Sequence, residues 1–239
     1  MRILRFLRPT FLRFTWRLVR ETLTDRVLDA DPLPIRVRDY VAAHASPGDP
    51  GDVLATMDRY AREVRFLMNL GPEKGPLVQE LLADLPRDAR ILELGAFCGY
   101  SSIMLASTLG PEGRIISVEK SGASVEGARA NVEHAGLADR IEIVHGRSTQ
   151  TIPELQGPFD LVFLDHWKDL YRQDLEAIER HELLRPGSIV VADNVGPLFG
   201  AHEYLDYVRN CGRYRSEHRE SSLEYSTVPD AVEISIFRP

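Results

Sequence analysis

Oxygen-bearing side chains follow two apolar runs in the second half of the chain. The run Phe159 to Asp165 ends in a carboxylate, and a later run from Ser188 ends in Asp193 and Asn194. Both runs have the composition of buried strands, and neighbouring parallel strands end at the same edge of a sheet. Carboxylate and amide oxygens suit Mg²⁺, which prefers octahedral oxygen ligands at about 2.1 Å. Asp165, Asp193 and Asn194 therefore predict a magnesium site.

A lysine stands on the turn that leaves this predicted site. Lys168 lies three residues after Asp165. Next to a divalent cation, an amine and a bound hydroxyl both lose protons more readily, so a neutral lysine could act as general base toward a substrate hydroxyl. The alternative is that Asp165 and Asp193 only cap turns and that Lys168 is a solvated charge. The occurrence of all four residues at two strand ends favours the catalytic interpretation.

A glycine-containing turn follows another short apolar run. The segment Glu93 to Ser101 reads ELGAFCGYS, in which Gly95 and Gly99 allow a tight turn and a close approach of the backbone to a ligand. Amide groups at the start of the next helix can bind a carboxylate or a phosphate. The following strand ends in Glu119, and a carboxylate at that place can accept both hydrogen bonds of a ribose diol.

Two nucleoside ligands fit this turn, an NAD-like dinucleotide and S-adenosylmethionine. The dinucleotide fingerprint G-x-G-x-x-G is not matched, and Phe97 would crowd a pyrophosphate. Glu93, just ahead of the turn, is suited to an ammonium group rather than to a phosphate. The residues therefore favour S-adenosylmethionine over NAD, and glycines that merely turn the chain remain a further alternative.

Strand and helix patterns alternate from residue 90 onward. The expected strands are Arg90–Leu94, Arg114–Glu119, Ile141–His145, Phe159–Asp165 and Ser188–Asp193. The expected helices are Val53–Leu70, Ser101–Leu109 with Ser101 as N-cap, Ser124–Ala135 and Leu170–Leu184. Two further runs, Arg213–Glu220 and Ala231–Phe237, look like an antiparallel pair at one edge. Near-continuous apolar strands indicate burial on both faces, so we predict an α/β fold with a doubly wound, mostly parallel sheet and a terminal hairpin.

Composition excludes several classes of protein. The chain has 239 residues, of which 44% are hydrophobic and 27% charged, as in ordinary globular proteins. A net charge of −7 disfavours a nucleic-acid partner. Two cysteines exclude a disulfide scaffold and suit a reducing compartment. No apolar run is long enough for a membrane span or a cleaved signal, so we expect a cytoplasmic protein, with association at the cytoplasmic face of a membrane as an open alternative.

The first twenty residues differ from the rest. They hold six arginines and no acid, and their apolar residues share one face of a helical wheel, with Pro9 as an interruption. Such a helix could contact an anionic membrane surface as a peripheral element, or it could pack on the domain or mediate self-association; the second interpretation is slightly favoured. The stretch Ala45 to Asp52 reads as a turn or linker. We therefore divide the chain into an N-terminal basic amphipathic helical segment (1–44) and a main domain (45–239).

Five segments resemble catechol O-methyltransferases, and they occur in the family's order. They are MNLGPEKG (68–75), LELGAFCGYS (92–101), LVFLDHWKD (161–169), ADNV (192–195) and SLEY (222–225). The resemblance implies a seven-stranded, Rossmann-like methyltransferase fold and a small-molecule catechol substrate. It implies that Asp165, Asp193 and Asn194 hold Mg²⁺ with both catechol oxygens on the metal, and that Lys168 is the base. Glu224 matches the family's glutamate at the second catechol hydroxyl.

The same resemblance assigns the cofactor site. Positions that match the family's S-adenosylmethionine contacts are Glu93, Gly95, Phe97 and Ser101 for the methionine part, Glu119 for the ribose, Ser148, His166 and Trp167 for the adenine, and Met68 and Leu70 beside the methyl group. Some positions depart from the family. Phe66 stands where a tryptophan often forms a wall of the catechol slot, Thr149 replaces a glutamine, and Pro197 is displaced. Phe66, Trp167 and Leu198 are candidates for the walls of the acceptor pocket.

Other functions stay open beside catechol methylation. The nearest is methylation of caffeoyl-type or other vicinal diols, which uses the same metal and lysine logic. The others are a dinucleotide oxidoreductase and a non-catalytic adaptor that binds S-adenosylmethionine. The arginine-rich start and the segment HASPGDPG also resemble the transmembrane O-methyltransferase branch. That branch lacks the full metal and lysine set, which this chain keeps, so catalysis is favoured.

Overall fold

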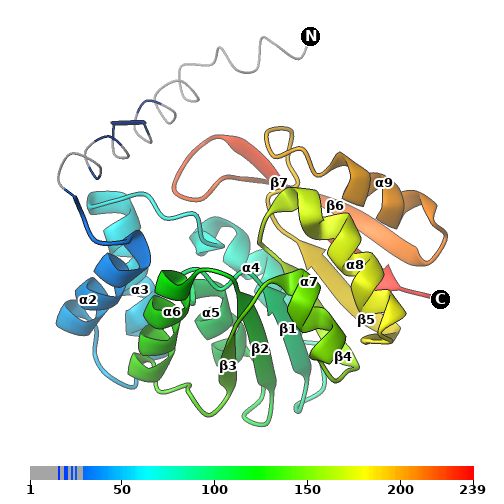
Figure 1. Cartoon of the computed structure of the whole chain (residues 1–239), viewed down its shortest axis with the longest axis horizontal. Helices are drawn as coiled ribbons and strands as arrows, with labels where there is room; N and C mark the ends of the chain where they lie inside the picture. Colours follow the sequence, from blue (N-terminus) through cyan, green and yellow to red (C-terminus); the bar gives the residue numbers. More distant parts are fainter. Residues whose placement is uncertain (1–15, 17–18, 21–22, 24, 26–28) are drawn as a thin grey trace.

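A seven-stranded mixed sheet forms the centre of the computed structural model, which describes residues 16, 19–20, 23, 25 and 29–239 (Figure 1). The strand order is β3-β2-β1-β4-β5-β7-β6. The strands are β1 (Arg90–Leu94), β2 (Arg114–Glu119), β3 (Ile141–His145), β4 (Phe159–Leu164), β5 (Leu184–Ala192), β6 (Tyr214–Ser222) and β7 (Pro229–Phe237). The first five are parallel, whereas β7 runs antiparallel to both β5 and β6. The predicted doubly wound sheet with a terminal hairpin is confirmed.

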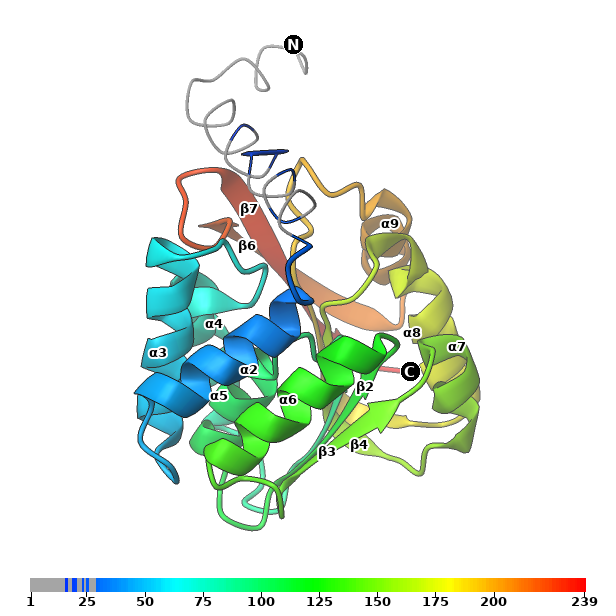
Figure 2. The ribbon, with the colours of Figure 1, turned by 60° about the vertical axis from the view of Figure 1, so that its left-hand side comes forward.

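Helices cover both faces of this sheet (Figure 2). One layer holds α2 (Leu33–His44), α3 (Pro50–Glu63), α4 (Gly71–Leu82), α5 (Tyr100–Thr108) and α6 (Gly122–His134). The other holds α7 (Ser148–Thr151), α8 (Tyr171–Arg180) and α9 (His202–Asn210). All six residues of β4 are buried: Leu161 and Phe163 belong to the core on one side, and Val162 and Leu164 to the core on the other. This two-sided burial explains why β4 is almost entirely apolar.

The direction of the connections reverses at β1. The chain first builds β2 and β3 on one side of β1 and then crosses to place β4 and β5 on the other side. In open α/β sheets, ligands bind beyond the carboxyl ends of the strands at such a switch point. The turns that follow β1, β2, β4 and β5 therefore define the part of the molecule in which to seek the site.

The N-terminal segment is described only in part. The helix predicted for residues 1–20 lies largely outside the described residues. Its contact with a membrane surface, with the domain or with a second copy therefore stays a prediction. Further along, α2 packs on α6 so closely that a Cβ on Gly127 would lie 2.7 Å from the carbonyl oxygen of Pro34. Division of the chain at residue 44 remains a prediction. Among the residues described, no helix is both long and apolar enough to cross a bilayer.

Two predicted boundaries before the sheet were wrong. The helix predicted to run from Val53 to Leu70 ends at Glu63, and a separate helix, α4, follows. Leu67 and Leu70 continue the buried pattern although they lie outside a helix, which made the two segments look like one. The turn predicted from Ala45 to Asp52 is confirmed as far as Asp49, but α3 already begins at Pro50. The Asp49 side chain accepts a hydrogen bond from the Asp52 amide (3.0 Å) and caps the helix.

Two further boundaries within the sheet region were also wrong. Ser101 is not an N-cap: α5 begins one residue earlier, and Gly99, with φ +83°, precedes it. The helix predicted over Leu170–Leu184 ends at Arg180, and Leu184 already opens β5. The pairing of β5 with β4 is irregular near its start, so the Pro-Gly turn signal there marks a break in register rather than the beginning of the strand.

Candidate active site

The structure places Asp165 and Asp193 at the same edge of the sheet. Each directly follows its strand, and each is held by the neighbouring strand through its backbone. The Asp165 amide donates to the carbonyl oxygen of Leu94 (3.0 Å), and the Asp193 amide donates to that of Leu164 (2.9 Å). The two carboxylates therefore extend from adjacent, rigid strand ends at the switch point of the sheet.

Asp193 belongs to a fully buried ionic cluster that sequence reasoning did not find. The Nζ atom of Lys74, on α4, lies 2.6 Å from Asp193 Oδ1 and 2.9 Å from Asp230 Oδ2, and it also pairs with Glu224 Oε1. All four side chains are inaccessible to solvent. One oxygen of each of the three carboxylates lies within 4.8 Å of the others, which is close enough for them to share a cation.

The cluster has more negative than positive charge. Burial raises the pKa of Asp193, and the neighbouring carboxylates of Asp165 and Asp230 raise it further, while Lys74 opposes them. Burial also raises the pKa of Glu224 against the same opposition from Lys74. For Lys74 itself, burial lowers the pKa, but attraction to the three carboxylates outweighs burial and keeps the amine charged. One ammonium thus balances three buried acids only in part.

The donor set fits a divalent cation. Asp193 Oδ2 and Glu224 Oε2 are buried and have no hydrogen-bond partner among the described residues. Such atoms are costly unless something else satisfies them, and a metal ion would do so. Asn194, with φ +52°, adopts a left-handed conformation that asparagine tolerates better than most residues. Its amide nitrogen donates to Asp230 Oδ2 (2.9 Å).

Lys168 lies beside this cluster on a 3₁₀ turn over Lys168–Leu170. Its Nζ atom donates to Asp165 Oδ1 (3.2 Å) and to the carbonyl oxygen of His166 (3.0 Å). The ring of Tyr171 lies beneath the amine, 5.4 Å from Nζ to the ring centre, and its hydroxyl donates to the carbonyl oxygen of Asp193 (3.0 Å). The amine is mostly buried and remains close to the strand ends that carry the carboxylates.

The glycine turn after β1 touches the turn after β4. Gly95 has φ +106°, and a Cβ built on it would lie 2.7 Å from the carbonyl oxygen of Asp165. Only glycine fits there. Two residues later, Phe97 has φ +45°, and its amide donates to Glu119 Oε2 (3.1 Å), while Glu119 Oε1 accepts from the Ser121 amide (2.8 Å). The carboxylate at the end of β2 therefore shapes the turn that it faces.

Glu93 is a buried acid with one unused oxygen. Its Oε2 atom accepts hydrogen bonds from the hydroxyls of Ser102 and Ser117, while Oε1 has no partner among the described residues. Burial raises the pKa of this carboxyl to about 7, although Ser101, Ser102 and Ser117 oppose the shift. A buried carboxylate oxygen of this kind can accept a hydrogen bond from a cationic donor.

The other predicted cofactor residues have varied environments. Leu70 is fully buried, and Met68 is 43% exposed. Ser148 is half-buried at the start of α7, after β3. The His166 ring nitrogen Nε2 lies 2.7 Å from Asp174 Oδ2, and Trp167 is 64% exposed. Their roles beside the methyl group and the adenine remain predictions.

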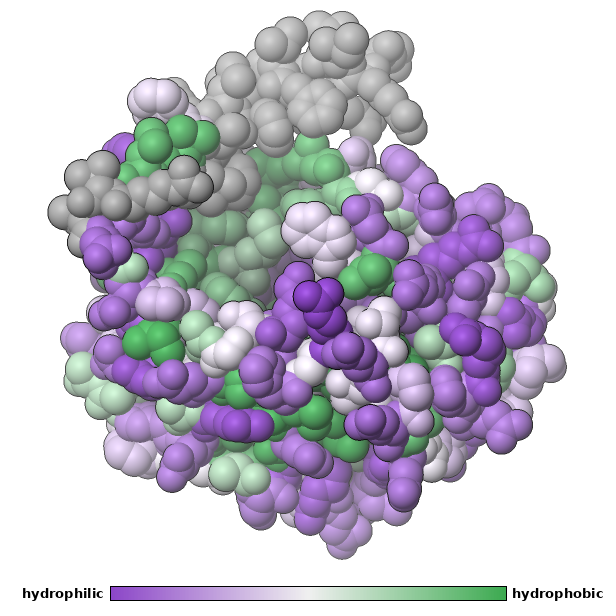
Figure 3. Space-filling view, in the orientation of Figure 1, coloured by the Kyte–Doolittle hydropathy of each residue, from purple (hydrophilic) through white to green (hydrophobic). Residues whose placement is uncertain are grey.

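An apolar cluster lies next to the buried acids. Phe66, Leu223 and Val228 are buried together, and Leu198 and Tyr225 pack against them. Figure 3 shows hydrophobic side chains in a hollow between the β6–β7 connection and the segment before α4, on a face that is otherwise mostly hydrophilic. Two of the predicted walls of the acceptor pocket, Phe66 and Leu198, belong to this cluster, whereas the third, Trp167, does not.

Known proteins match this chain over most of its length. A family model described as "Methyltransferase domain" matches residues 92–195. Catechol O-methyltransferase B from Danio rerio is 37% identical over 225 residues, covering 91% of this chain and 84% of that protein. Catechol O-methyltransferase from Bos taurus is 38% identical over 209 residues, covering 85% of this chain and 76% of its own.

The chain belongs to the catechol O-methyltransferase family. Relatives with a different name also match this chain. The transmembrane O-methyltransferase of Homo sapiens is 36% identical over 205 residues, covering 82% of this chain and 69% of that protein. Among solved structures, the O-methyltransferase TomG from Streptomyces achromogenes in complex with SAM has a TM-score of 0.67 and 26% identity, over 78% of this chain and 89% of that one. This chain has an O-methyltransferase function, and S-adenosylmethionine is its supported cofactor.

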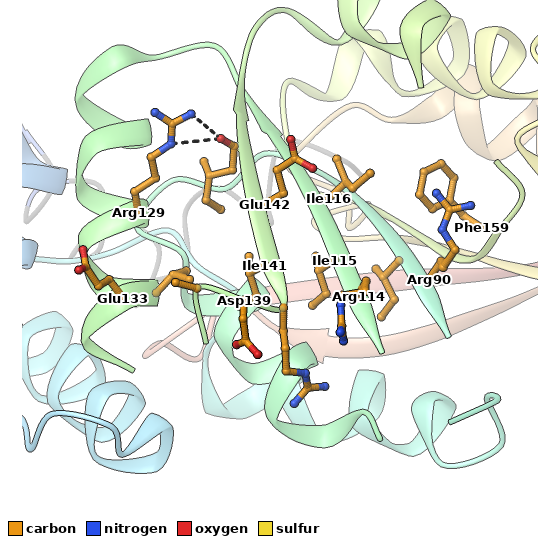
Figure 4. Close-up of a pocket in the computed structure, with 15 residues that line it drawn as sticks. Arg90, Arg114, Ile115, Ile116, Arg129, Glu133, Asp139, Ile141, Glu142 and Phe159 are labelled. Carbon is orange, nitrogen blue, oxygen red and sulfur yellow. Dashed lines mark hydrogen bonds between the residues drawn. The ribbon is translucent and has the colours of Figure 1, made fainter. Parts of the chain in front are cut away.

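A second depression on the surface of this protein lies at the amino ends of the parallel strands, opposite the candidate site. It has a volume of about 620 Å³ and is lined by the first residues of several strands, as Figure 4 shows. Its guanidinium groups bind backbone carbonyls: Arg129 Nη2 donates to Ile143 (2.7 Å), and Arg90 Nη2 donates to Gln156 (2.6 Å). These arginines stabilise loop and strand ends, and the groove is far from the carboxyl ends where the family's chemistry is expected.

Proposed function

We propose that this protein transfers a methyl group from S-adenosylmethionine to one hydroxyl of a catechol, with Mg²⁺ bound at the site and Lys168 as general base. The observation that supports this proposal best is the convergence of an amine and buried carboxylates on one sheet edge. Lys168 contacts Asp165, and Asp193 follows the adjacent strand. The glycine turn at Gly95 abuts the same edge. These contacts support the proposal, because a methyl donor at the glycine turn, the base and an acceptor would then lie together at one sheet edge.

Three residues would hold the metal: Asp165, Asp193 and Asn194. They offer two carboxylates and an amide carbonyl, which are donors that Mg²⁺ prefers. The buried, unpartnered Asp193 Oδ2 supports this assignment. A bound Mg²⁺ would supply Lewis-acid polarisation of the hydroxyl oxygens of the acceptor and would balance the surplus negative charge.

The turn after β1 and the end of β2 would hold the cofactor. Glu93 Oε1 would accept a hydrogen bond from the ammonium group of the methionine part, and Glu119 would accept hydrogen bonds from the ribose hydroxyls. Both oxygens of Glu119 already bind backbone amides, but each retains a second lone pair for this purpose. The cofactor would supply an electrophilic methyl group on a positively charged sulfur.

The side chains around the acceptor have different roles in the proposed reaction. Lys168 accepts the proton of the reacting hydroxyl at Nζ, and Glu224 accepts a hydrogen bond from the second hydroxyl at its free Oε2. Phe66 and its neighbours exclude water from the ring of the acceptor. Holding the reacting groups in line contributes a proximity effect of about 7–11 kcal/mol in favourable cases.

A methyl-transfer screen tests the proposal. The full chain is incubated with S-adenosylmethionine and Mg²⁺ against small catechols, caffeoyl compounds and matched phenols that carry a single hydroxyl, and products are measured by mass spectrometry. We expect monomethylated products from catechols and none from the single-hydroxyl phenols. Binding of S-adenosylmethionine without any methylated vicinal diol would contradict catalysis and would indicate an adaptor.

Cofactor binding is expected to depend on pH through Glu93. Its folded-state pKa of about 7 lies above the ordinary value of 4.5, so protonation stabilises the unliganded protein as the pH falls toward 7 and below. An ammonium ligand needs the carboxylate instead, so the affinity for S-adenosylmethionine should fall between pH 8 and 6, by up to about tenfold per unit below the pKa. Calorimetric titration measures this slope.

The matched variant for this prediction is Glu93→Gln, which keeps the shape of the side chain and removes its titration. It should bind the cofactor more weakly at pH 8, with a much flatter dependence on pH. The charge of Asp165 also raises the pKa of Glu93, so Asp165 is left unchanged in both the wild-type protein and the variant. An equally steep slope in the variant would show that another group is responsible.

A further inference from the structure

Lys74 contacts three carboxylates, and in two of them, Asp193 and Glu224, the contact leaves one oxygen used and the other free. It binds Oδ1 of Asp193 and Oε1 of Glu224, and it leaves Asp193 Oδ2 and Glu224 Oε2 without a hydrogen-bond partner among the described residues. A carboxylate held through one oxygen cannot rotate freely, so the direction of its second oxygen is fixed. The two free oxygens belong to the residues that we assign to the metal and to the second acceptor hydroxyl.

Asp230 anchors the other side of this arrangement. Its Oδ2 atom accepts from Lys74 Nζ (2.9 Å) and from Asn194 Nδ2 (2.9 Å), and its Oδ1 atom accepts from the Gly196 amide (3.1 Å). An ionised carboxylate only accepts hydrogen bonds, so the amide group of Asn194 must present its nitrogen to Asp230. The carbonyl oxygen of the planar amide then faces away from Asp230, which leaves it available as a ligand.

We propose that Lys74 and Asp230 are positioning residues that fix the metal-binding and acceptor-binding oxygens of Asp193, Asn194 and Glu224. Lys74 orients the two carboxylates, and Asp230 holds both Lys74 and the amide of Asn194. The inference rests on the proposed function, because it assigns a task to residues around the proposed metal. Outer residues that orient metal ligands typically change metal affinity by about 10–100-fold when they are removed.

The rival explanation is that Lys74 only neutralises charge. Four variants separate the two explanations. Lys74→Met removes both the charge and the contacts, while Lys74→Met with Asp230→Asn restores the net charge of the cluster without restoring the contacts of Lys74. Arg209→Met is the matched control, because it breaks another cation–carboxylate pair outside the site, between Arg209 on α9 and the buried Glu233 on β7. Asp230→Asn alone completes the double-mutant cycle.

The first measurement is the binding of Mn²⁺ to each metal-free protein, monitored through the electron paramagnetic resonance signal of the free ion. The second is the thermal stability of each protein. We expect the affinity for Mn²⁺ to fall at least about tenfold in Lys74→Met and to stay low in the double variant, although its stability recovers. Arg209→Met should lose stability and keep the wild-type affinity. In turnover assays, the KM for catechol should also rise in both Lys74 variants because Glu224 is no longer held.

The outcomes are distinguishable. Wild-type affinity in Lys74→Met, or its recovery in the double variant, would overturn the positioning role and leave the proposed function intact. A wild-type protein that binds no Mn²⁺ and methylates no catechol would instead overturn the proposed function itself. If Lys74→Met fails to fold, the charge-balanced double variant decides the question alone.

Discussion

Lys168→Met is expected to lower kcat for catechol methylation by about 10²-fold or more, while the affinity for S-adenosylmethionine stays nearly unchanged. General base catalysis contributes about 10²–10⁴-fold in enzymes, and methionine keeps a similar length without an amine. The variant should fold, since methionine keeps most of the side-chain volume and only the hydrogen bonds to Asp165 and to the carbonyl oxygen of His166 are lost. Single-turnover rates measured with saturating catechol and cofactor would isolate the chemical step.

Lys168→Arg is the control for charge. A guanidinium keeps a positive group beside Asp165 but does not accept a proton at neutral pH. We therefore expect it to be nearly as slow as Lys168→Met if the lysine is the base. If Lys168→Arg is nearly as fast as wild type, or if Lys168→Met retains the full rate, the role of Lys168 is electrostatic or negligible.

Removal of divalent metal by EDTA is expected to abolish turnover, a loss of at least about 10³-fold. Metal ions stabilise developing charge by several kcal/mol, and each 1.36 kcal/mol corresponds to a factor of ten in rate. Addition of excess Mg²⁺ or Mn²⁺ should restore the rate. Ca²⁺ should restore it poorly, because it prefers a larger and more flexible set of oxygen ligands.

Asp165→Asn provides the genetic counterpart of the chelation experiment. It keeps the size of the side chain, lies outside the buried Lys74 cluster, and should require much higher Mg²⁺ for half-maximal rate. Cofactor binding measured in EDTA controls for unfolding and should be unchanged within a few-fold. Full activity in EDTA, with no metal carried through purification, would remove the metal from the mechanism.

The parallel strands could be predicted because their burial is visible in the chain itself. β1, β2 and β3 have the predicted bounds, and β4 differs by one residue. Strand ends also predicted where Asp165, Asp193 and Glu119 would lie, since topology brings the carboxyl ends together. Helix ends were less predictable: apolar residues such as Leu67 and Leu184 continued a helical pattern although the chain had already left the helix.

The Lys74–Asp230 pair could not be predicted from spacing. The two residues are 156 positions apart, and their contact forms only because the fold brings the first turn of α4 to the start of β7. Lys74 also lies two residues before Pro76, which stands inside α4 and weakens the prediction of a helix from the sequence. A lysine in such a stretch is usually solvated, so its complete burial becomes visible only in the fold.

The contact between the turns after β1 and β4 has a consequence for reactivity. Because Gly95 leaves no side chain between its Cα and the backbone of Asp165, a direct contact between the two main chains would set the spacing between the proposed donor site and the proposed acceptor site. Rotamer changes in the surrounding side chains would leave that separation nearly constant. In the proposed site, substitutions among the residues that line the hollow would therefore change acceptor preference while leaving the distance from sulfur to oxygen the same.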